Sequence, residues 1–271
     1  MRREDFDFLA RLARRRAGLS LPPDRGALVV QQLQPVMRRF DFRDVGAMVA
    51  DLRLGHPALA EAAVEALTVG ETSFFRDAAL FARLEGKVLP RLLAARIATR
   101  HLRIWSAGCA TGQEAWSLAM LVDRMGLAAR GWLVDIIATD LSADAVMRAA
   151  EGRYSDFEVA RGLSPEDLST WFEADAPGFH RIAPRLRAMV SFRRFNLLDS
   201  FGWLDDLDIV LCRNVLIYFD PATRQSVVER IAETLAPDGV LALGEAECPP
   251  AGFASLPGGG LYAKTPRSVM L

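Results

Sequence analysis

The stretch from Ile104 to Met120 combines residue types that suit the binding of a nucleotide-like ligand. An apolar strand end runs into a turn of small residues, Gly108, Ala110 and Gly112, and an apolar-periodic helix is expected to begin near Glu114. Small residues in such a turn let a ligand approach the backbone closely. The pattern G-x-A-x-G is a relaxed form of the dinucleotide fingerprint, and many strand-to-helix turns need glycine for geometry alone. The turn is therefore a candidate ligand loop that does not by itself identify the ligand.

An acidic residue follows the next expected strand, Val134 to Thr139. In doubly wound sheets a carboxylate at the end of the second strand accepts hydrogen bonds from a ribose diol. Asp140 stands at that place. The alternative is that Asp140 caps the helix starting near Leu141, a role that Ser142 could fill equally well. Because the turn and the acid occur in order, we favour an adenosine-containing ligand.

Two later strands, expected at Val190 to Phe195 and at Asp208 to Cys212, also end in polar segments. The residues that follow them are Asn196, Leu197 and Asp199 in the first case, and Arg213, Asn214 and Tyr218 in the second. Side chains at the carboxyl ends of parallel strands tend to lie in the ligand site. Asn196 and Leu197 could meet an adenine edge by a hydrogen bond and an apolar contact. For Tyr218 the alternative is a core tyrosine with a satisfied hydroxyl group.

The elements that would position these residues begin with a helical region from Asp5 to about Leu67. Gly26 to Phe40 is expected to form an amphipathic helix, kinked at Pro35, with one apolar face: Leu28, Val29, Leu33, Val36, Met37 and Phe40. The first 40 residues carry nine arginines and four acidic residues, a local excess of five positive charges. This excess makes a candidate docking face for an acidic partner, the alternative being an ordinary solvated helix surface.

A linker with unusual content, Thr68 to Phe81, joins the helical region to the sheet. Gly70 and Thr72 precede a pair of phenylalanines and then Arg76. One interpretation is that the phenylalanines anchor the linker while Arg76 forms a surface ion pair of little energetic weight. The functional interpretation places Arg76 beside a ligand in a crevice between domains, where such sites tend to form.

The rest of the chain fits an α/β sheet with an insertion. Phe179 to Phe192 is expected to form two or three short antiparallel strands. Asp220 and Pro221 open a helix that runs to about Leu235, in the N-cap and N1 order. Val240 to Leu243 is expected to be a fifth strand, and a loop from Pro249 to Gly260 should lead to a last strand at Leu261 to Lys264.

Composition excludes several classes of protein. The 271 residues are 51% hydrophobic and carry a formal charge of -1, which argues against a surface built for nucleic acid. Three widely spaced cysteines predict no disulfide framework, and the three histidines form no metal-ligand spacing with them, so we expect no metal. The sequence shows no signal core and no run of about 18 uncharged apolar residues. We therefore expect a soluble, cytoplasmic protein.

These residues resemble a known family, the chemotaxis receptor methyltransferases of the CheR type, over nearly the whole chain. The resemblance is carried by five blocks in order: T-x-x-x-T-x-FFR (Thr68 to Arg76), SAGCATGQE (Ser106 to Glu114), ATDLS (Ala138 to Ser142), FNLLD (Phe195 to Asp199) and CRNVLIYFD (Cys212 to Asp220).

The resemblance implies a doubly wound, Rossmann-like methyltransferase sheet with an N-terminal all-helical domain and a small antiparallel β insertion. The expected parts are a helical domain over 1–67, a linker over 68–82 that contributes to the cofactor site, and a methyltransferase domain over 83–271 with the insertion at about 173–192. The implied reaction transfers a methyl group from S-adenosylmethionine to receptor glutamate carboxylates, giving methyl esters and S-adenosylhomocysteine. The implied partner is the helical cytoplasmic domain of chemotaxis receptors, which would bind to the basic N-terminal helices and the β insertion. The protein is expected to be a monomer.

The resemblance also assigns roles to individual residues. The implied cofactor-binding residues are Thr72, Arg76, Glu114, Asp140, Asn196, Leu197, Arg213 and Asn214. Asp140 would hold the ribose and Glu114 would face the methionine end. Arg76 and Tyr218, the implied catalytic residues, would lie nearest the transferred methyl group.

The sequence departs from the family pattern at several positions. Gly70 stands where the family commonly has asparagine, Gln113 and Ala115 replace Glu and Pro in the turn, and GEAE (Gly244 to Glu247) replaces GHSE. The insertion looks short between Asp175 and Ile182, which predicts receptor binding that does not need a receptor-tail peptide.

Three other functions stay open on the sequence. They are a methyltransferase with a small-molecule or RNA acceptor, a non-catalytic cofactor-sensing module that docks on signalling proteins, and a nicotinamide-dependent oxidoreductase. The last is the least favoured, because the turn lacks a full G-x-G-x-x-G signature.

Overall fold

The computed structural model describes residues 1–249 and 252–265, and the chain divides into two compact units. The first unit comprises Met1–Val69 together with two short segments, Asn196–Leu198 and Val215–Val227. The second comprises Gly70–Phe195, Asp199–Asn214 and the described residues from Val228 onward. Across the described ranges, no helix is both long enough and apolar enough to cross a membrane.

The first unit is helical. Its helices are α1 (Arg3–Ala17), α2 (Gly26–Arg39), α3 (Val45–Arg53) and α4 (Pro57–Ala66), with a 3-10 turn η1 (Pro23–Arg25) before α2. Their apolar stripes enclose a core in which Leu9, Leu33, Met48 and Leu59 are fully buried. The helical prediction for this region is therefore confirmed.

The predicted apolar face of α2 is wrong at its two ends. Val29, Leu33, Val36 and Met37 are buried, but Leu28 is 41% exposed. At about 100° per residue, Leu28 lies well away from the centre of the stripe. Phe40 lies beyond the last helical residue, and the helix itself runs through Pro35 without ending.

The two short segments of this unit contact its N-terminal part. Leu19 and Phe219 form an antiparallel bridge, and the backbone N–H of Ser20 donates to the carbonyl oxygen of Tyr218 at 2.7 Å. The guanidinium of Arg14 lies 3.2 Å from the carboxylate of Asp220. Arg14, counted in the expected basic face, is thus paired within its own unit.

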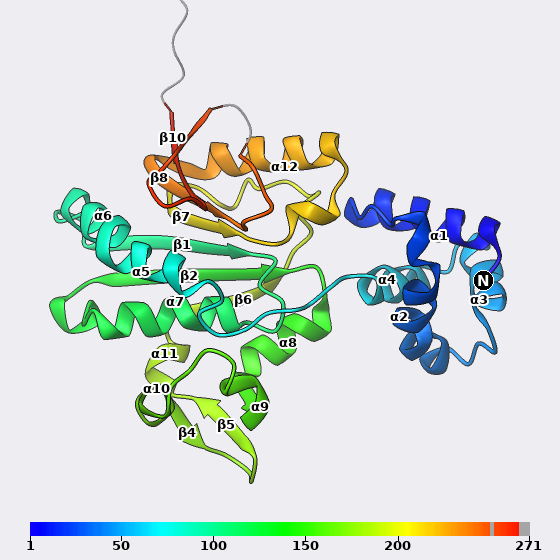
Figure 1. The fold of residues 1–271 in the computed structure, drawn as a ribbon, viewed down its shortest axis with the longest axis horizontal. Helices are drawn as coiled ribbons and strands as arrows, with labels where there is room; N and C mark the ends of the chain where they lie inside the picture. The colour runs from blue at the N-terminus through cyan, green and yellow to red at the C-terminus, as the bar shows by residue number, and fades with distance from the viewer. Residues whose placement is uncertain (250–251, 266–271) are drawn as a thin grey trace, which may run out of the picture. The chain divides into compact units, whose positions relative to one another are not determined.

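The second unit is built on a seven-stranded sheet in the order β6-β2-β1-β7-β8-β10-β9 (Figure 1). Its strands are β1 (His101–Ala107), β2 (Leu133–Asp140), β6 (Val190–Arg194), β7 (Leu207–Cys212), β8 (Leu235–Leu243), β9 (Phe253–Ser255) and β10 (Leu261–Lys264). The first five are parallel, while β10 is antiparallel to β8 and β9. The order reverses between β1 and β7, and ligands of open α/β sheets bind at such a switch point.

Helices flank this sheet. They are α5 (Ala78–Arg83), α6 (Leu89–Ala95), α7 (Gln113–Arg124), α8 (Ala143–Glu151) and the later part of α12 (Pro221–Thr234), with a π-helical turn η2 (Leu84–Val88) between α5 and α6 and a 3-10 turn η3 (Ala128–Arg130) before β2. Figure 1 shows α7 along one side of the strands and α12 along the other. All six residues of β7 are buried, as expected for a strand covered on both faces. The predicted α/β class is confirmed.

The insertion differs in extent from the prediction. It is a three-stranded antiparallel sheet in the order β3 (Arg153–Ser155), β5 (Phe179–Ile182), β4 (Phe172–Ala174), accompanied by three short helices: α9 (Asp156–Val159), α10 (Pro165–Trp171) and α11 (Pro184–Arg187). The range 173–192 therefore misses β3 and takes in residues that belong to α11 and to β6 of the main sheet. The three-residue run of β3 has a single apolar side chain, Tyr154, which is too little for an alternating pattern to be visible.

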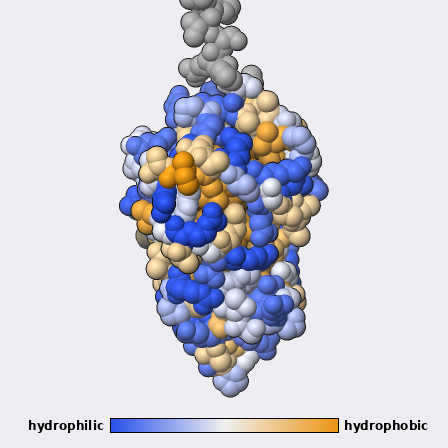
Figure 2. Space-filling view, turned by 90° about the vertical axis from the view of Figure 1, so that its left-hand side faces the viewer, coloured by the Kyte–Doolittle hydropathy of each residue, from blue (hydrophilic) through white to orange (hydrophobic). Residues whose placement is uncertain are grey.

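The insertion is held by a buried ring contact and carries ion pairs on a surface that also exposes Phe157 and Phe179. Tyr154 is 1% exposed, and its ring lies 5.0 Å from that of Phe74 in an edge-on contact. The side chains of Arg153 and Arg181 both bind Asp175. Figure 2 shows hydrophilic residues spread over the lower part of this face, where the insertion lies. The predicted loop from Pro249 to Gly260 contains β9, and its residues 250 and 251 lie outside the described residues.

Candidate functional site

The turn after β1 has the backbone that its small residues allow. Gly108, Ala110 and Gly112 have φ of 74°, 48° and 92°, in the left-handed region. The backbone N–H groups of Gly108 and Cys109 donate to the carbonyl oxygen of Thr139 at 2.8 and 2.9 Å, which ties the turn to the end of β2. A Cβ at Gly112 would lie 2.7 Å from that of Ala149 in α8, so this glycine is required by packing as well as by its conformation.

Asp140, the last residue of β2, bridges the two strand ends. Its Oδ2 accepts the backbone N–H of Ala110 at 2.8 Å, and its Oδ1 accepts that of Ser142 at 2.9 Å. Ser142 caps α8 through a hydrogen bond from the N–H of Ala145, so Asp140 is not the helix cap. Burial raises the pKa of Asp140 above its ordinary value. Each carboxylate oxygen can still accept a further hydrogen bond, as a ribose diol would require.

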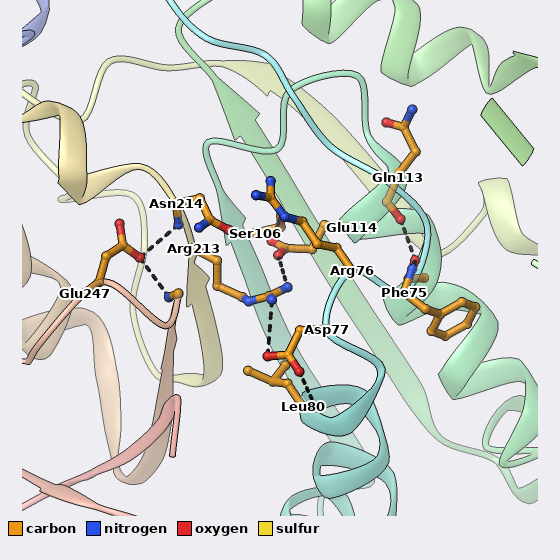
Figure 3. Close-up of polar contacts among 12 residues, drawn as sticks. Phe75, Arg76, Asp77, Leu80, Ser106, Gln113, Glu114, Arg213, Asn214 and Glu247 are labelled. Carbon is orange, nitrogen blue, oxygen red and sulfur yellow. Dashed lines mark hydrogen bonds and ion pairs between the residues drawn. The ribbon is translucent and has the colours of Figure 1, made fainter. Parts of the chain in front are cut away.

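Arg76 lies between two linker residues with strained backbones. Phe75 and Asp77 have φ of 46° and 67°, which non-glycine residues rarely adopt. The backbone N–H of Phe75 donates to Oγ of Ser117 in α7 at 2.9 Å, and the Asp77 carboxylate caps α5 through the N–H of Leu80 (Figure 3). The chain is thus fixed on both sides of Arg76. Such strain is concentrated at functional sites.

The first residues of the linker lie beside the turn. A Cβ built at Gly70 would meet the Cβ of Ala110 at 4.0 Å, an ordinary contact, and nothing closer. Thr72 is half-buried. The guanidinium of Arg76, also half-buried, donates to the carbonyl oxygen of Glu71 at 3.0 Å.

Arg213, at the end of β7, joins three elements through its guanidinium. Its Nη1 lies 3.1 Å from Oε2 of Glu114 in α7, and its Nη2 lies 3.5 Å from Oδ2 of Asp77. The hydroxyl of Ser106 in β1 donates to the other oxygen of Glu114 at 2.8 Å. Figure 3 shows these side chains pointing toward one another. Two carboxylates around one guanidinium leave this cluster with a net charge of about -1 at neutral pH.

Asn214 follows Arg213 in the second unit, and its backbone N–H donates to Oε2 of Glu247 at 2.9 Å. The other predicted site residues, Asn196, Leu197 and Tyr218, belong to the first unit. The side-chain amide of Asn196 donates to the carbonyl oxygen of Arg16 at 2.7 Å and its oxygen accepts the N–H of Leu198. Leu197 is buried. Tyr218 ends a short 3-10 turn, η4 (Leu216–Tyr218), and is half-buried. The cofactor and catalytic roles of these residues stay predictions.

Sequence analysis missed four residues that support the site: Asp77, Ser106, Ser117 and Glu247. Asp77 stands directly before an apolar run, which is an N-cap signal, but it was treated as part of the linker. Ser106 and Ser117 act through contacts between elements distant in sequence, which no local pattern reveals. Glu247 was noted only as part of a departure from a family pattern.

Family models match both parts of the chain. Residues 70–251 match the model described as CheR methyltransferase, SAM binding domain, and residues 4–68 match CheR methyltransferase, all-alpha domain. The chain belongs to the CheR methyltransferase family. This confirms the resemblance drawn from the five sequence blocks.

Curated relatives agree with this membership. The chain is 39% identical over 246 residues to chemotaxis protein methyltransferase 1 of Pseudomonas aeruginosa, covering 90% of this chain and 89% of that protein. It is 37% identical over 247 residues to chemotaxis protein methyltransferase Cher2 of Pseudomonas putida, covering 90% of each. It is 32% identical over 248 residues to the chemotaxis protein methyltransferase of Escherichia coli, covering 89% of this chain and 83% of that protein.

Proposed function

We propose that this CheR-family chain transfers the methyl group of S-adenosylmethionine to glutamate side-chain carboxylates of chemotaxis receptors, forming methyl esters and S-adenosylhomocysteine. One observation carries the proposal. The chain matches the SAM binding domain, and its polar groups gather at the carboxyl ends of β1, β2 and β7. Asp140 lies there beside the turn after β1, and the Arg213 cluster, made of Arg213, Glu114 and Asp77, lies beside Arg76. The relatives above carry the name chemotaxis protein methyltransferase.

The residues present fit this cofactor. The buried Asp140 offers carboxylate oxygens to a ribose diol, and the left-handed turn lets an adenosyl group approach the backbone. Bound S-adenosylmethionine supplies a methyl group on a positively charged sulfur, and its methionine end carries an ammonium and a carboxylate group. A carboxylate attracts such positive charge, and Glu114 is the carboxylate of the Arg213 cluster suited to the methionine end.

The acceptor needs little help from acid-base chemistry. A glutamate carboxylate is ionised at neutral pH, so it can attack the methyl carbon without losing a proton to a base. Arg76 would orient the incoming carboxylate through charge-assisted hydrogen bonds, and its fixed backbone keeps the guanidinium in place. Alignment of the two reacting atoms supplies most of the acceleration. We assign Tyr218 to the same step on the basis of the family resemblance alone.

The receptor's helical domain would meet the exposed arginines of α1. Arg14 is paired with Asp220, and the others are Arg3, Arg11, Arg15 and Arg16. We propose that the chain acts in the cytoplasm as a monomer, and that it binds receptors without a tail peptide.

A labelled-methyl assay tests the function. Purified protein is incubated with methyl-labelled S-adenosylmethionine and the cytoplasmic fragment of a chemotaxis receptor, and the label is then tested for release by alkali. Base-labile label on the receptor supports the proposal, because esters hydrolyse in alkali. Base-stable label on RNA or on a metabolite contradicts it, as does tight cofactor binding without turnover on any receptor. Arg76→Lys, which keeps the charge but loses the planar fork, should lower kcat at least about tenfold.

A further inference from the structure

Glu247, a buried carboxylate with no role in the proposed reaction, ties the ends of two neighbouring strands together. It lies four residues beyond the end of β8 and is 2% exposed. Its Oε2 accepts the backbone N–H of Gly244 at 2.8 Å and that of Asn214 at 2.9 Å (Figure 3). Asn214 follows β7, which is the parallel neighbour of β8. One oxygen atom therefore joins the carboxyl ends of both strands.

The backbone around this oxygen is shaped to admit it. A Cβ at Gly244 would lie 2.8 Å from Nδ2 of Asn214, closer than real Cβ atoms approach, and 3.0 Å from Oε2 of Glu247, which is tighter than most real Cβ contacts. Asn214 has a φ of 58°, in the left-handed region, which asparagine tolerates better than most residues but still at a cost. A hydrogen bond from its N–H to a buried carboxylate is charge-assisted and strong enough to hold such a conformation.

The conformation of Asn214 sets the direction of its neighbour. Arg213 precedes it, and the guanidinium of Arg213 must reach both Glu114 at 3.1 Å and Asp77 at 3.5 Å from a side chain that is only 4% exposed. In the described part of the chain, Nε of Arg213 is one of three buried side-chain polar atoms without a hydrogen-bond partner. The ion pairs of Arg213 thus depend on a backbone held at the correct angle.

We propose that Glu247 is a positioning residue for the Arg213–Asn214 segment, an inference that rests on the proposed function. Its carboxylate fixes the left-handed backbone of Asn214, and through it the guanidinium of Arg213 against Glu114. The cofactor then meets a preformed cluster, which avoids the cost of ordering these groups on binding.

Three variants and a control separate this role from a general loss of stability. Glu247→Ala removes the oxygen that accepts both N–H groups, and we expect S-adenosylhomocysteine to bind at least about tenfold more weakly by calorimetry. Glu247→Gln keeps an oxygen that can accept both N–H groups, so its affinity should stay within about threefold of the original. Gly244→Ala leaves the carboxylate but pushes it away from Asn214, and should weaken binding as Glu247→Ala does. Glu245→Ala, at an exposed carboxylate two residues earlier, should change nothing.

A double-mutant cycle shows whether Glu247 acts through Arg213. If it does, Glu247→Ala combined with Arg213→Ala should bind no more weakly than Arg213→Ala alone, whereas independent effects would multiply. Amide hydrogen exchange at Asn214 should be faster in Gly244→Ala than in the original protein, and this measurement needs no cofactor. If Glu247→Ala does not fold, Gly244→Ala and Glu247→Gln carry the same comparison.

The outcomes separate the two proposals. Glu247→Ala with unchanged affinity in a folded protein, or multiplying effects in the cycle, overturns the positioning role while leaving the methyltransferase function intact. Failure of the original protein to bind S-adenosylhomocysteine overturns the proposed function instead, and the exchange at Asn214 still reports whether Glu247 holds the segment.

Discussion

Replacing Asp140 by alanine should remove most of the affinity for S-adenosylhomocysteine. Each carboxylate oxygen of Asp140 accepts one backbone N–H and has room for one more hydrogen bond. A ribose diol would donate one hydrogen bond to each oxygen. Hydrogen bonds to a charged group contribute about 1.5–3 kcal/mol each, so the pair is expected to contribute at least about 3 kcal/mol. This corresponds to a dissociation constant raised at least about 100-fold. Calorimetry at neutral pH measures it directly.

The stability of the variant should change much less than its affinity. Truncation leaves the N–H groups of Ala110 and Ser142 without their acceptor, but it also removes a carboxylate whose burial is costly. We expect the free energy of unfolding to change by less than about 2 kcal/mol, measured by urea titration. Asp144→Ala, at an exposed acid four residues later in α8, is the matched control. Equal affinity in Asp140→Ala and the original protein would refute the assignment of the ribose to Asp140.

Three further predictions follow from single positions. Gly70→Asn introduces the residue common in the family at a position where a Cβ would meet nothing closer than 4.0 Å. The cofactor affinity measured by calorimetry should therefore stay equal or rise, and a loss of more than about threefold would count against this. Because burial raises the pKa of Asp140, cofactor affinity should fall on acidification at a higher pH than an ordinary aspartate would give, and Asp140→Asn should lack this step. By linkage, the contribution of this carboxyl to the free energy of unfolding is greatest below its unfolded pKa and is lost as pH rises through the folded pKa. Gly162→Ala should lower the free energy of unfolding, measured by urea titration, by about 3 kcal/mol or more. Gly162 has a φ of 109°, and a Cβ there would lie 2.0 Å from the carbonyl oxygen of Phe74. A change below about 0.5 kcal/mol would contradict this geometry.

The sequence predicted most of the central sheet because its strands carry strong local signals. The predicted strand Asp208 to Cys212 is apolar from Ile209 onward, as a strand covered on both faces requires, and it corresponds to β7 with one residue missing at the start. Pro221 directly after Asp220 marked the start of α12 correctly. These features depend on neighbours along the chain, so a single sequence suffices to show them.

The supporting contacts of the site were not predictable in the same way. Phe75 takes a left-handed backbone because Ser117, 42 residues later, accepts its N–H, and nothing near Phe75 in the sequence indicates this. Glu247 lies 33 residues from Asn214, and the contact exists only because β7 and β8 are neighbours in the sheet. The strand β3 was missed for a similar reason, since its three residues are extended by pairing with β5 and not by their own pattern.

The most direct test of the central claim is to find the atoms that carry the methyl group. A receptor cytoplasmic fragment, incubated with this protein and S-adenosylmethionine, is digested and its peptides are mapped by mass spectrometry before and after mild alkali. We predict methyl groups on glutamate side chains that disappear with alkali and that form at least about tenfold more slowly with Arg76→Lys. Methyl groups on any other side chain, or a receptor left unmodified while the cofactor is bound, would contradict the account.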